Sequence, residues 1–262
     1  MGPEVGAPGA DGFAGRSLVA VFAHPDDESL ASGGLLAACA ARGARVTLVC
    51  ATRGDLRAGD TDAALGDTRV AELARAARVL GLAEVVHLDL PDGYLPWVDV
   101  EAFDAVLVRE LQRLSPDVVV TFGADGLYWH PDHVVVHERT TAAVGALGER
   151  APALYYVTMP GGQVRRIVES CRFGAAPGET VLGITDPDAF GALAAPPTLV
   201  LDVRDVAARK LEALQCHRSQ VAGGPFARMR ADAATRLLGV EHYHRAALPS
   251  ARDAFIERLP CV

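Results

Sequence analysis

Short, continuously apolar segments alternate along this chain with longer segments of helical periodicity. We interpret the short apolar segments as strands with apolar side chains on both faces. Such strands indicate a parallel sheet that is covered by helices on either side. The predicted strands up to residue 159 are Ser17–Ala23, Arg45–Thr52, Glu84–Leu90, Asp117–Phe122 and Ala153–Met159. The helices predicted between them are Ser29–Arg42, Asp67–Leu80, Glu101–Leu114 and Pro131–Leu147.

This alternation predicts the fold class and the place of a ligand site. Right-handed crossovers between such strands give a doubly wound, Rossmann-like α/β sheet that is mostly parallel, with helices on both faces. In the strand order 3-2-1-4-5, the first and fourth strands are neighbours. Ligands then bind in the crevice outside the carboxyl ends of these two strands.

The regular alternation stops between residues 160 and 197, in a stretch rich in glycine and proline. Two interpretations are open for this excursion: a lid that caps the site, or a surface loop. We expect one domain over residues 1–262, with a flexible N-terminus at 1–15. The other predicted parts are a strand Thr198–Val203, a helix Val206–Ser219, and a C-terminal segment 226–262 that is helical near Ala227–Leu238 and irregular afterwards.

Composition excludes several classes of protein. The chain has 262 residues, 50% of them hydrophobic, which is enough for one large core. Its 25 basic and 33 acidic residues give a net charge of −8, which argues against a partner that is a nucleic acid or an anionic membrane. The five cysteines are widely spaced without a C-x-x-C pair, so neither a disulfide framework nor a zinc knuckle is expected. No apolar run reaches about 18 residues and no signal peptide is recognisable, so we expect a cytoplasmic protein without a membrane span.

The first strand runs directly into a histidine and three consecutive acids, His24-Pro25-Asp26-Asp27-Glu28. A dinucleotide-binding enzyme would carry G-x-G-x-x-G here, so its absence argues against nicotinamide or flavin chemistry. Like charges this close are unfavourable unless a cation or hydrogen-bond donors compensate them. The spacing of His24 and Asp27 across a proline turn can direct both side chains at one ion.

A second polar motif, His130-Pro131-Asp132-His133, opens the helix that follows the fourth strand. Pro131 suits the first helical turn, where its missing N–H costs nothing. His130 and His133 lie one turn apart on roughly one side of the helix. Either motif alone is also consistent with ordinary helix capping. Both together, at the crevice that the topology predicts, indicate a functional site.

Two histidines and one carboxylate form the ligand set of a hydrolytic zinc site whose fourth position is open to water. Such an ion lowers the pKa of water and polarises a carbonyl group. A further carboxylate nearby can then serve as the general base. The two motifs therefore favour metal-assisted hydrolysis.

The stretches Ala23–Glu28 and His130–His133 resemble the two motifs of the PIG-L/LmbE-like metal-dependent N-deacetylases, which act on N-acetylglucosamine-type conjugates. The resemblance covers most of the chain. Weaker similarities to this family lie at Ala51–Asp55, where Asp replaces the usual Glu, at Leu90–Gly93, and at Leu214–Gln220 with its His-x-Ser-Gln pattern.

The resemblance implies His24, Asp27 and His133 as the ligands of a zinc ion. Ferrous iron is the alternative metal, because the same ligands suit both ions. Asp26 is implied as the general base that activates the water and later protonates the departing amine.

Further roles are implied around these ligands. His130 would stabilise the oxyanion as an imidazolium, with Asp132 supporting its charge. Tyr128 would be a mobile tyrosine that assists the tetrahedral intermediate, unless it is an ordinary loop aromatic. Arg53 and Asp92 would hydrogen bond to sugar hydroxyls, although helix capping and surface ion pairs explain these two residues equally well.

Three other polar residues receive smaller roles. Glu28 is predicted to be structural, since the helix dipole favours an acid in the first turn. His217 lies in the His-x-Ser-Gln stretch and is expected at the rim of the site. His137, one turn beyond His133, is predicted to be structural.

The predicted reaction is hydrolysis of an acetamide on an amino-sugar conjugate, which is a small-molecule substrate, to acetate and a free amine. One alternative is an amidase that removes a larger acyl group from a glycopeptide or a thiol conjugate. A two-metal phosphoesterase and a sugar-binding protein without catalytic activity are the others. The aglycone stays open among thiol biosynthesis, antibiotic tailoring and lipid-linked sugars, and the sequence carries no signal for an oligomeric state.

Overall fold

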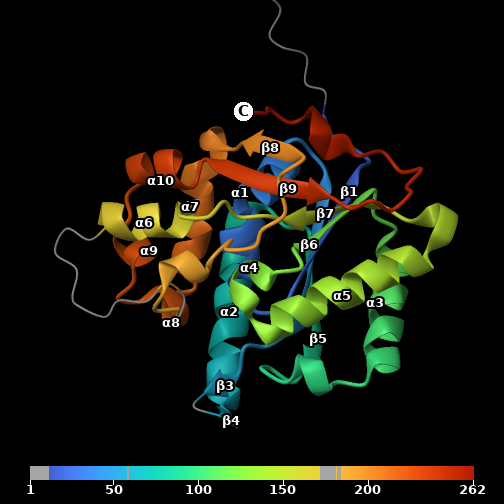
Figure 1. The fold of residues 1–262 in the computed structure, drawn as a ribbon, viewed down its shortest axis with the longest axis horizontal. Coiled ribbons are helices and arrows are strands. Elements are labelled where there is room, and N and C mark those ends of the chain that lie inside the picture. Colours follow the sequence, from blue (N-terminus) through green and yellow to red (C-terminus); the bar gives the residue numbers. More distant parts are fainter. Residues whose placement is uncertain (1–11, 58, 172–180, 182–183) are drawn as a thin grey trace, which may run out of the picture.

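The computed structural model describes residues 12–57, 59–171, 181 and 184–262, and its centre is a seven-stranded sheet (Figure 1). The strand order is β5-β2-β1-β6-β7-β9-β8. The strands are β1 (Ser17–Phe22), β2 (Arg45–Thr52), β5 (Glu84–Leu90), β6 (Val118–Phe122), β7 (Ala153–Val157), β8 (Leu199–Asp202) and β9 (Val240–Arg245). A separate hairpin pairs β3 (Leu56–Arg57) with β4 (Asp60–Thr61).

The first five strands of this order pair in parallel, as the sequence predicts. The predicted order 3-2-1-4-5 and the Rossmann-like α/β class are confirmed, with β1 and β6 as neighbours. Two antiparallel pairings extend the sheet, because β9 lies between β7 and β8. The prediction of an irregular chain after Leu238 is wrong at β9. Its inward-facing residues include the buried polar Glu241 and Tyr243, so the strand shows no apolar alternation.

Two groups of helices cover the two faces of the sheet (Figure 1). The helices α1, α2 and α7 pack together, and α3 packs on α5. The longer helices are α1 (Asp27–Ala41), α2 (Ala63–Leu80), α3 (Val100–Leu114), α5 (Pro131–Ala146) and α7 (Ala207–Cys216). The shorter ones are α4 (Gly126–Trp129), α6 (Gln163–Cys171), α8 (Arg218–Val221), α9 (Pro225–Arg228) and α10 (Ala231–Leu237).

Two predicted helices are each divided in the structure. The helix expected over 206–219 breaks at His217, whose backbone is not helical, and resumes as α8. The helix expected over 227–238 is split into α9 and α10 by extended backbone at Met229 and Arg230. No described helix is long and apolar enough to cross a bilayer. The cytoplasmic location stays a prediction.

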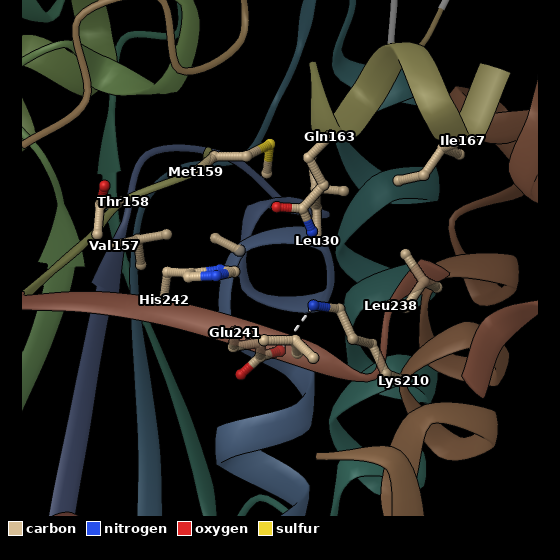
Figure 2. Close-up of a pocket in the computed structure, with 12 residues that line it drawn as sticks. Leu30, Val157, Thr158, Met159, Gln163, Ile167, Lys210, Leu238, Glu241 and His242 are labelled. Atoms are coloured by element: carbon tan, nitrogen blue, oxygen red, sulfur yellow. Dashed lines mark hydrogen bonds and ion pairs between the residues drawn. The ribbon is translucent and has the colours of Figure 1, made fainter. Parts of the chain in front are cut away.

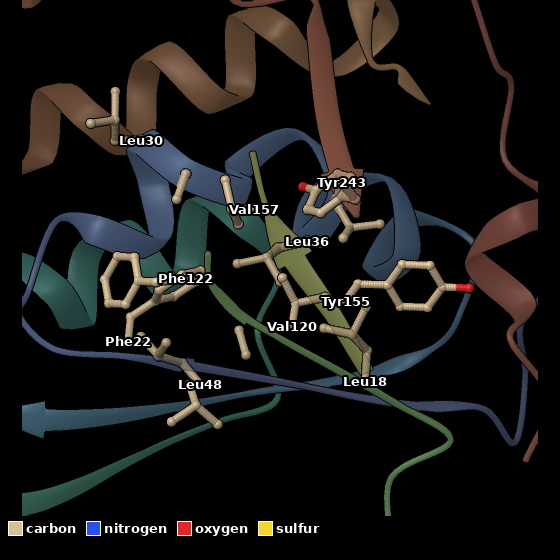
Figure 3. Packing of buried hydrophobic residues seen from close by; sticks show 14 of the residues in the cluster. Leu18, Phe22, Leu30, Leu36, Leu48, Val120, Phe122, Tyr155, Val157 and Tyr243 are labelled. Atoms are coloured by element: carbon tan, nitrogen blue, oxygen red, sulfur yellow. The ribbon is translucent and has the colours of Figure 1, made fainter. Parts of the chain in front are cut away.

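The core lies between the sheet and its helices, and it includes residues near both ends of the described chain, such as Phe13 and Phe255. Figure 3 shows Phe22 and Phe122 at the ends of β1 and β6, with their ring centroids 4.9 Å apart. Residues 1–11 of the predicted flexible N-terminus lie outside the described residues. Phe13, from the same predicted segment, is buried against Phe255.

A buried ion pair joins β9 to the helices on one face. Lys210, the only lysine of the chain, donates to the Glu241 carboxylate at 2.6 Å, and both side chains are buried (Figure 2). Glu241 also accepts hydrogen bonds from the amides of Gly34 and Leu35 and from the Tyr243 hydroxyl. A Cβ at Gly34 would lie 2.9 Å from Glu241 Oε1, so glycine permits this close approach.

Glu241→Gln is expected to lower the free energy of unfolding by about 3–5 kcal/mol, because it leaves the buried Lys210 ammonium without its counter-charge. Urea denaturation measures the change. Arg45→Gln is the control, since it breaks an exposed pair with Glu84 and should change stability by less than about 1 kcal/mol. Equal losses in the two variants would show that the buried pair has no special role.

Candidate active site

The two polar motifs emerge side by side from neighbouring strands. β1 and β6 pair in register from Leu18 with Val118 to Ala20 with Val120. The turn after β1 carries His24 into the start of α1, and the turn after β6 passes through α4 to His133 on α5. Residues that are 109 positions apart in sequence thereby come into contact. The site lies where the topology predicts it.

The three expected metal ligands converge on one point. His24 Nδ1 lies 3.2 Å from His133 Nε2 and 3.4 Å from Asp27 Oδ2. His133 Nε2 lies 3.3 Å from Asp27 Oδ1. Ligand atoms bound tetrahedrally to zinc at 2.0–2.1 Å are roughly 3.3 Å apart, so each of these separations is compatible with the ion, with a different Asp27 oxygen facing each histidine. All three side chains are buried.

The charge states of Asp27 and His133 suit a cation, whereas the carboxylates around His24 raise the pKa of that ring despite its burial. Burial opposes the charge on Asp27, but the hydrogen bonds and the charge of His24 outweigh it and hold the pKa of this carboxyl well below its usual range. Burial lowers the pKa of His133 to about 3, which leaves a neutral ring. Its Nδ1 faces the carbonyl oxygen of Gly126 at 3.0 Å, and this contact fixes the tautomer with the lone pair of Nε2 toward the other ligands.

Two carboxylates orient the other histidine ligand. His24 Nε2 lies 3.1 Å from Asp132 Oδ2 and 3.1 Å from Asp92 Oδ1, which leaves Nδ1 to face the ligand cluster. Asp132 also accepts hydrogen bonds from the backbone amides of Gly93 and Leu95. This orienting role on His24 was not part of the sequence-based interpretation, which paired Asp132 with His130.

His130 is oriented by the backbone of its own helix. Its Nδ1 accepts the Asp132 N–H at 3.2 Å, as an N-cap of α5. A neutral ring therefore carries its proton on Nε2. Burial and the nearby His24 lower the pKa of His130, against the smaller opposite effect of Asp132. These observations favour a neutral hydrogen-bond donor over the imidazolium that the resemblance implied.

Asp26 lies beside the ligand cluster and takes no part in it. Its carboxylate is buried, and burial raises the pKa of Asp26 to about 6, although the Arg69 guanidinium opposes this shift. Arg69 Nη2 lies 3.4 Å from Asp26 Oδ2, and the guanidinium also donates to the carbonyls of Pro25 and Gly54. Sequence analysis missed Arg69, because nothing local distinguishes it from the other arginines of an exposed-looking helix.

A cavity of about 250 Å³ opens over this cluster. Arg53 is not among its lining residues, because its guanidinium pairs with Asp67 at 2.6 Å and Asp89 at 3.5 Å. Asp92 does line the cavity, and it also accepts a hydrogen bond from the amide of Leu56. The lining residues are His24, Asp26, Asp27, Leu30, Leu56, Arg69, Asp92, Gly93, Tyr128, His130, Ile184 and Gln220.

The described part of the excursion reaches the cavity wall. Ile184 lines the cavity, and the buried Phe190 packs on Tyr128 with ring centroids 4.7 Å apart. The amide of Gly191 donates to the carbonyl of Leu127 at 2.8 Å. Tyr128 in turn contacts the rings of His130 and His133. Residues 172–180 and 182–183 of the excursion lie outside the described residues.

Comparison with known proteins identifies the family. Residues 19–144 match the PIG-L model, described as GlcNAc-PI de-N-acetylase. A relative from Acidothermus cellulolyticus, named 1D-myo-inositol 2-acetamido-2-deoxy-alpha-D-glucopyranoside deacetylase, is 33% identical over 259 residues, which cover 87% of this chain and 88% of the relative. The chain belongs to the PIG-L family. The predicted family and enzyme class, an N-deacetylase, are confirmed.

Solved structures share the fold of this PIG-L protein. N,N'-diacetylchitobiose deacetylase from Pyrococcus horikoshii has a TM-score of 0.62 and 18% identity, over 88% of this chain and 84% of that chain. The 4-carboxy-2-hydroxymuconate hydratase of Pseudomonas putida also has a TM-score of 0.62, with 20% identity over 91% of this chain and 98% of that chain. Because a deacetylase and a hydratase share this fold, the chemistry must be argued from the site.

Proposed function

We propose that this PIG-L protein removes the acetyl group from an N-acetylglucosaminyl conjugate of inositol, with His24, Asp27 and His133 holding a zinc ion. The separation of their ligand atoms, 3.2–3.4 Å beside a buried carboxylate, is the observation that carries the proposal. The proposed substrate class is taken from the name of the Acidothermus cellulolyticus relative, which is 33% identical to this chain over 259 residues. A divalent ion held at this site would supply Lewis acidity, which polarises an acyl carbonyl and makes water more acidic.

Asp26 acts as the general base. It takes a proton from the attacking water and returns that proton to the nitrogen of the departing amino sugar. Its pKa of about 6 is closer to neutrality than that of an exposed aspartate, which makes the carboxylate a stronger base and its conjugate acid still able to donate. Arg69 Nη2 lies 3.4 Å from Asp26 Oδ2 and pairs with this carboxylate.

His130 donates a hydrogen bond from Nε2–H to the acyl oxygen, on which the oxyanion forms when water adds to the carbonyl carbon. This role needs no positive charge on the ring, because the capping contact at Nδ1 already fixes the required tautomer. A donor that is oriented before the reaction stabilises the developing charge without reorganisation.

Sugar hydroxyls are proposed to bind Asp92, which lines the cavity. Arg53 can contribute only by leaving Asp67, and this exchange costs little because the pair is exposed. The described part of the excursion, through Ile184 and Phe190, is proposed to cover the bound substrate.

Tyr128→Phe is expected to lower kcat by about 10- to 100-fold with little change in metal content. Within the described residues the Tyr128 hydroxyl has no hydrogen-bond partner, so it is available to the tetrahedral intermediate. Tyr156→Phe is the matched control, because the Tyr156 hydroxyl bonds to Thr141 away from the cavity. Equal kcat values in both variants would remove Tyr128 from the mechanism.

Acetate release from a panel of N-acetylglucosamine conjugates tests the proposal. We expect the inositol conjugate to give the highest kcat/KM among inositol, aryl, lipid and peptide aglycones with the same acetyl group. Faster release of a longer acyl chain from a glycopeptide would support the amidase alternative. Tight sugar binding by the zinc-loaded protein without acetate release would support the sugar-binding alternative and overturn the proposal.

A further inference from the structure

We propose that Glu28 and His217 form a positioning pair that fixes the backbone of Asp26 and directs its carboxylate into the cavity. The inference rests on the proposed role of Asp26 as the base. Neither Glu28 nor His217 lines the cavity, so the pair acts through Asp26 rather than on the substrate.

Asp26 has an unusual backbone conformation. Its φ of 121° and ψ of −26° lie in a region that residues with a Cβ rarely adopt. An aspartate that precedes a helix ordinarily turns its carboxylate back to accept from the first amides of the helix. The Asp26 carboxylate makes no such bond with α1. The strained conformation therefore keeps the carboxylate away from the helix and available to the site, and it persists only if neighbouring groups enforce it.

Glu28 supplies the local constraint. Its Oε2 accepts the backbone N–H of Asp26 at 3.0 Å. Its Oε1 accepts from the Ser29 hydroxyl and from His217 Nε2, the latter at 2.9 Å. The Glu28 side chain is fully buried, so no solvent competes for either oxygen. This role is more specific than the favourable contact with the helix dipole that the sequence indicated.

His217 supplies the constraint from outside the turn. It lies 189 positions after Glu28 in the sequence, in the break between α7 and α8. Its side chain is fully buried and contacts Glu28. The expected place at the rim of the site is therefore wrong, since the ring lies behind the carboxylate that holds Asp26. The break in the helix places a hydrogen-bond donor where a continuous helix could not.

His217→Leu tests the pair by removing the donor. We expect kcat to fall by about 10- to 100-fold, because a displacement of about 1 Å in a catalytic group is enough for such a loss. KM and the bound metal should change by less than about twofold. His217→Gln should recover most of kcat, since its amide can still donate to Glu28. Glu28→Gln should resemble His217→Leu, because one oxygen cannot accept for both Asp26 and His217.

Ser219→Ala is the matched control on the same segment. Its hydroxyl donates to the buried carboxylate of Glu72 on α2 at 2.5 Å and does not contact Asp26. We expect the control to lose stability without losing kcat. If His217→Leu keeps kcat, or loses kcat and bound metal in the same proportion, the positioning role is wrong.

A crystal structure of His217→Leu provides a readout that does not depend on activity. We expect Asp26 to leave the positive φ region and its carboxylate to cap α1. An unchanged Asp26 conformation would overturn the inference. A wild-type protein that releases no acetate would instead overturn the proposed function, and the two failures are therefore distinguishable.

Discussion

Asp26→Asn is expected to lower kcat by about 100- to 10,000-fold while the metal stays bound. The amide has nearly the shape of the carboxylate, so the cavity and the contact with Arg69 are largely preserved. It cannot accept a proton from water, and it cannot return one to the amine. Because the proposed ligand atoms belong to His24, Asp27 and His133, elemental analysis should find the same metal content as in the wild-type protein.

Asp104→Asn controls for the substitution itself. Asp104 pairs with Arg139 on the outer helices, away from the cavity, so this variant should keep wild-type kcat. The role of Asp26 as base is contradicted if Asp26→Asn retains more than about a tenth of kcat. Loss of the metal in Asp26→Asn would instead make this residue a ligand.

His133→Ala is expected to abolish both tight metal binding and acetate release. Its Nε2 is one of three converging ligand atoms, and its ring also stacks on Phe122 at 4.0 Å between centroids. Removing even an outer contact of a metal site commonly costs 10- to 100-fold in affinity, so removing a ligand should cost more than about 100-fold. Metal titration of the purified variant measures the loss.

His137→Ala is the control on the same helix. His137 lies one turn further along α5, and its Nδ1 bonds to the carbonyl of Phe122 at 2.9 Å instead of facing the ligand cluster. This variant should bind metal with wild-type affinity. Equal affinities for His133→Ala and His137→Ala would remove His133 from the ligand set.

The parallel part of the fold and the meeting of the two motifs were predictable, because both follow from local patterns. The buried runs of β1 and β6 are apolar apart from Ser17 and Thr121, and a right-handed crossover rule makes them neighbours. His24 follows β1 directly, and His133 opens the helix after β6. Their positions after neighbouring strands therefore place both side chains at the same edge of the sheet.

Contacts between buried polar side chains, and contacts between distant segments, were not predictable from local patterns. The sequence of β9 lacks the alternation of apolar and polar residues typical of a strand, because the charged Glu241 is buried with Lys210. His217 resembles an ordinary helical residue until the break that turns it toward Glu28 is known. Arg69 contacts Asp26, and Phe190 contacts Tyr128. Both contacts join segments that are far apart in the sequence, and no local pattern in either segment indicates its partner.

The roles of His130 and Asp132 depend on tautomers and partners rather than on residue types. The family resemblance implied a charged His130 supported by Asp132. The structure instead has the Asp132 amide on His130 Nδ1 and the Asp132 carboxylate on His24. Distances between individual atoms were needed to separate these arrangements.

Acetate release by the protein before and after removal of its metal tests the central claim most directly. The wild-type protein should lose essentially all activity on exhaustive chelation, keep its fold by circular dichroism, and recover on addition of about one equivalent of zinc. Undiminished acetate release by protein that elemental analysis finds free of divalent metal would contradict the account.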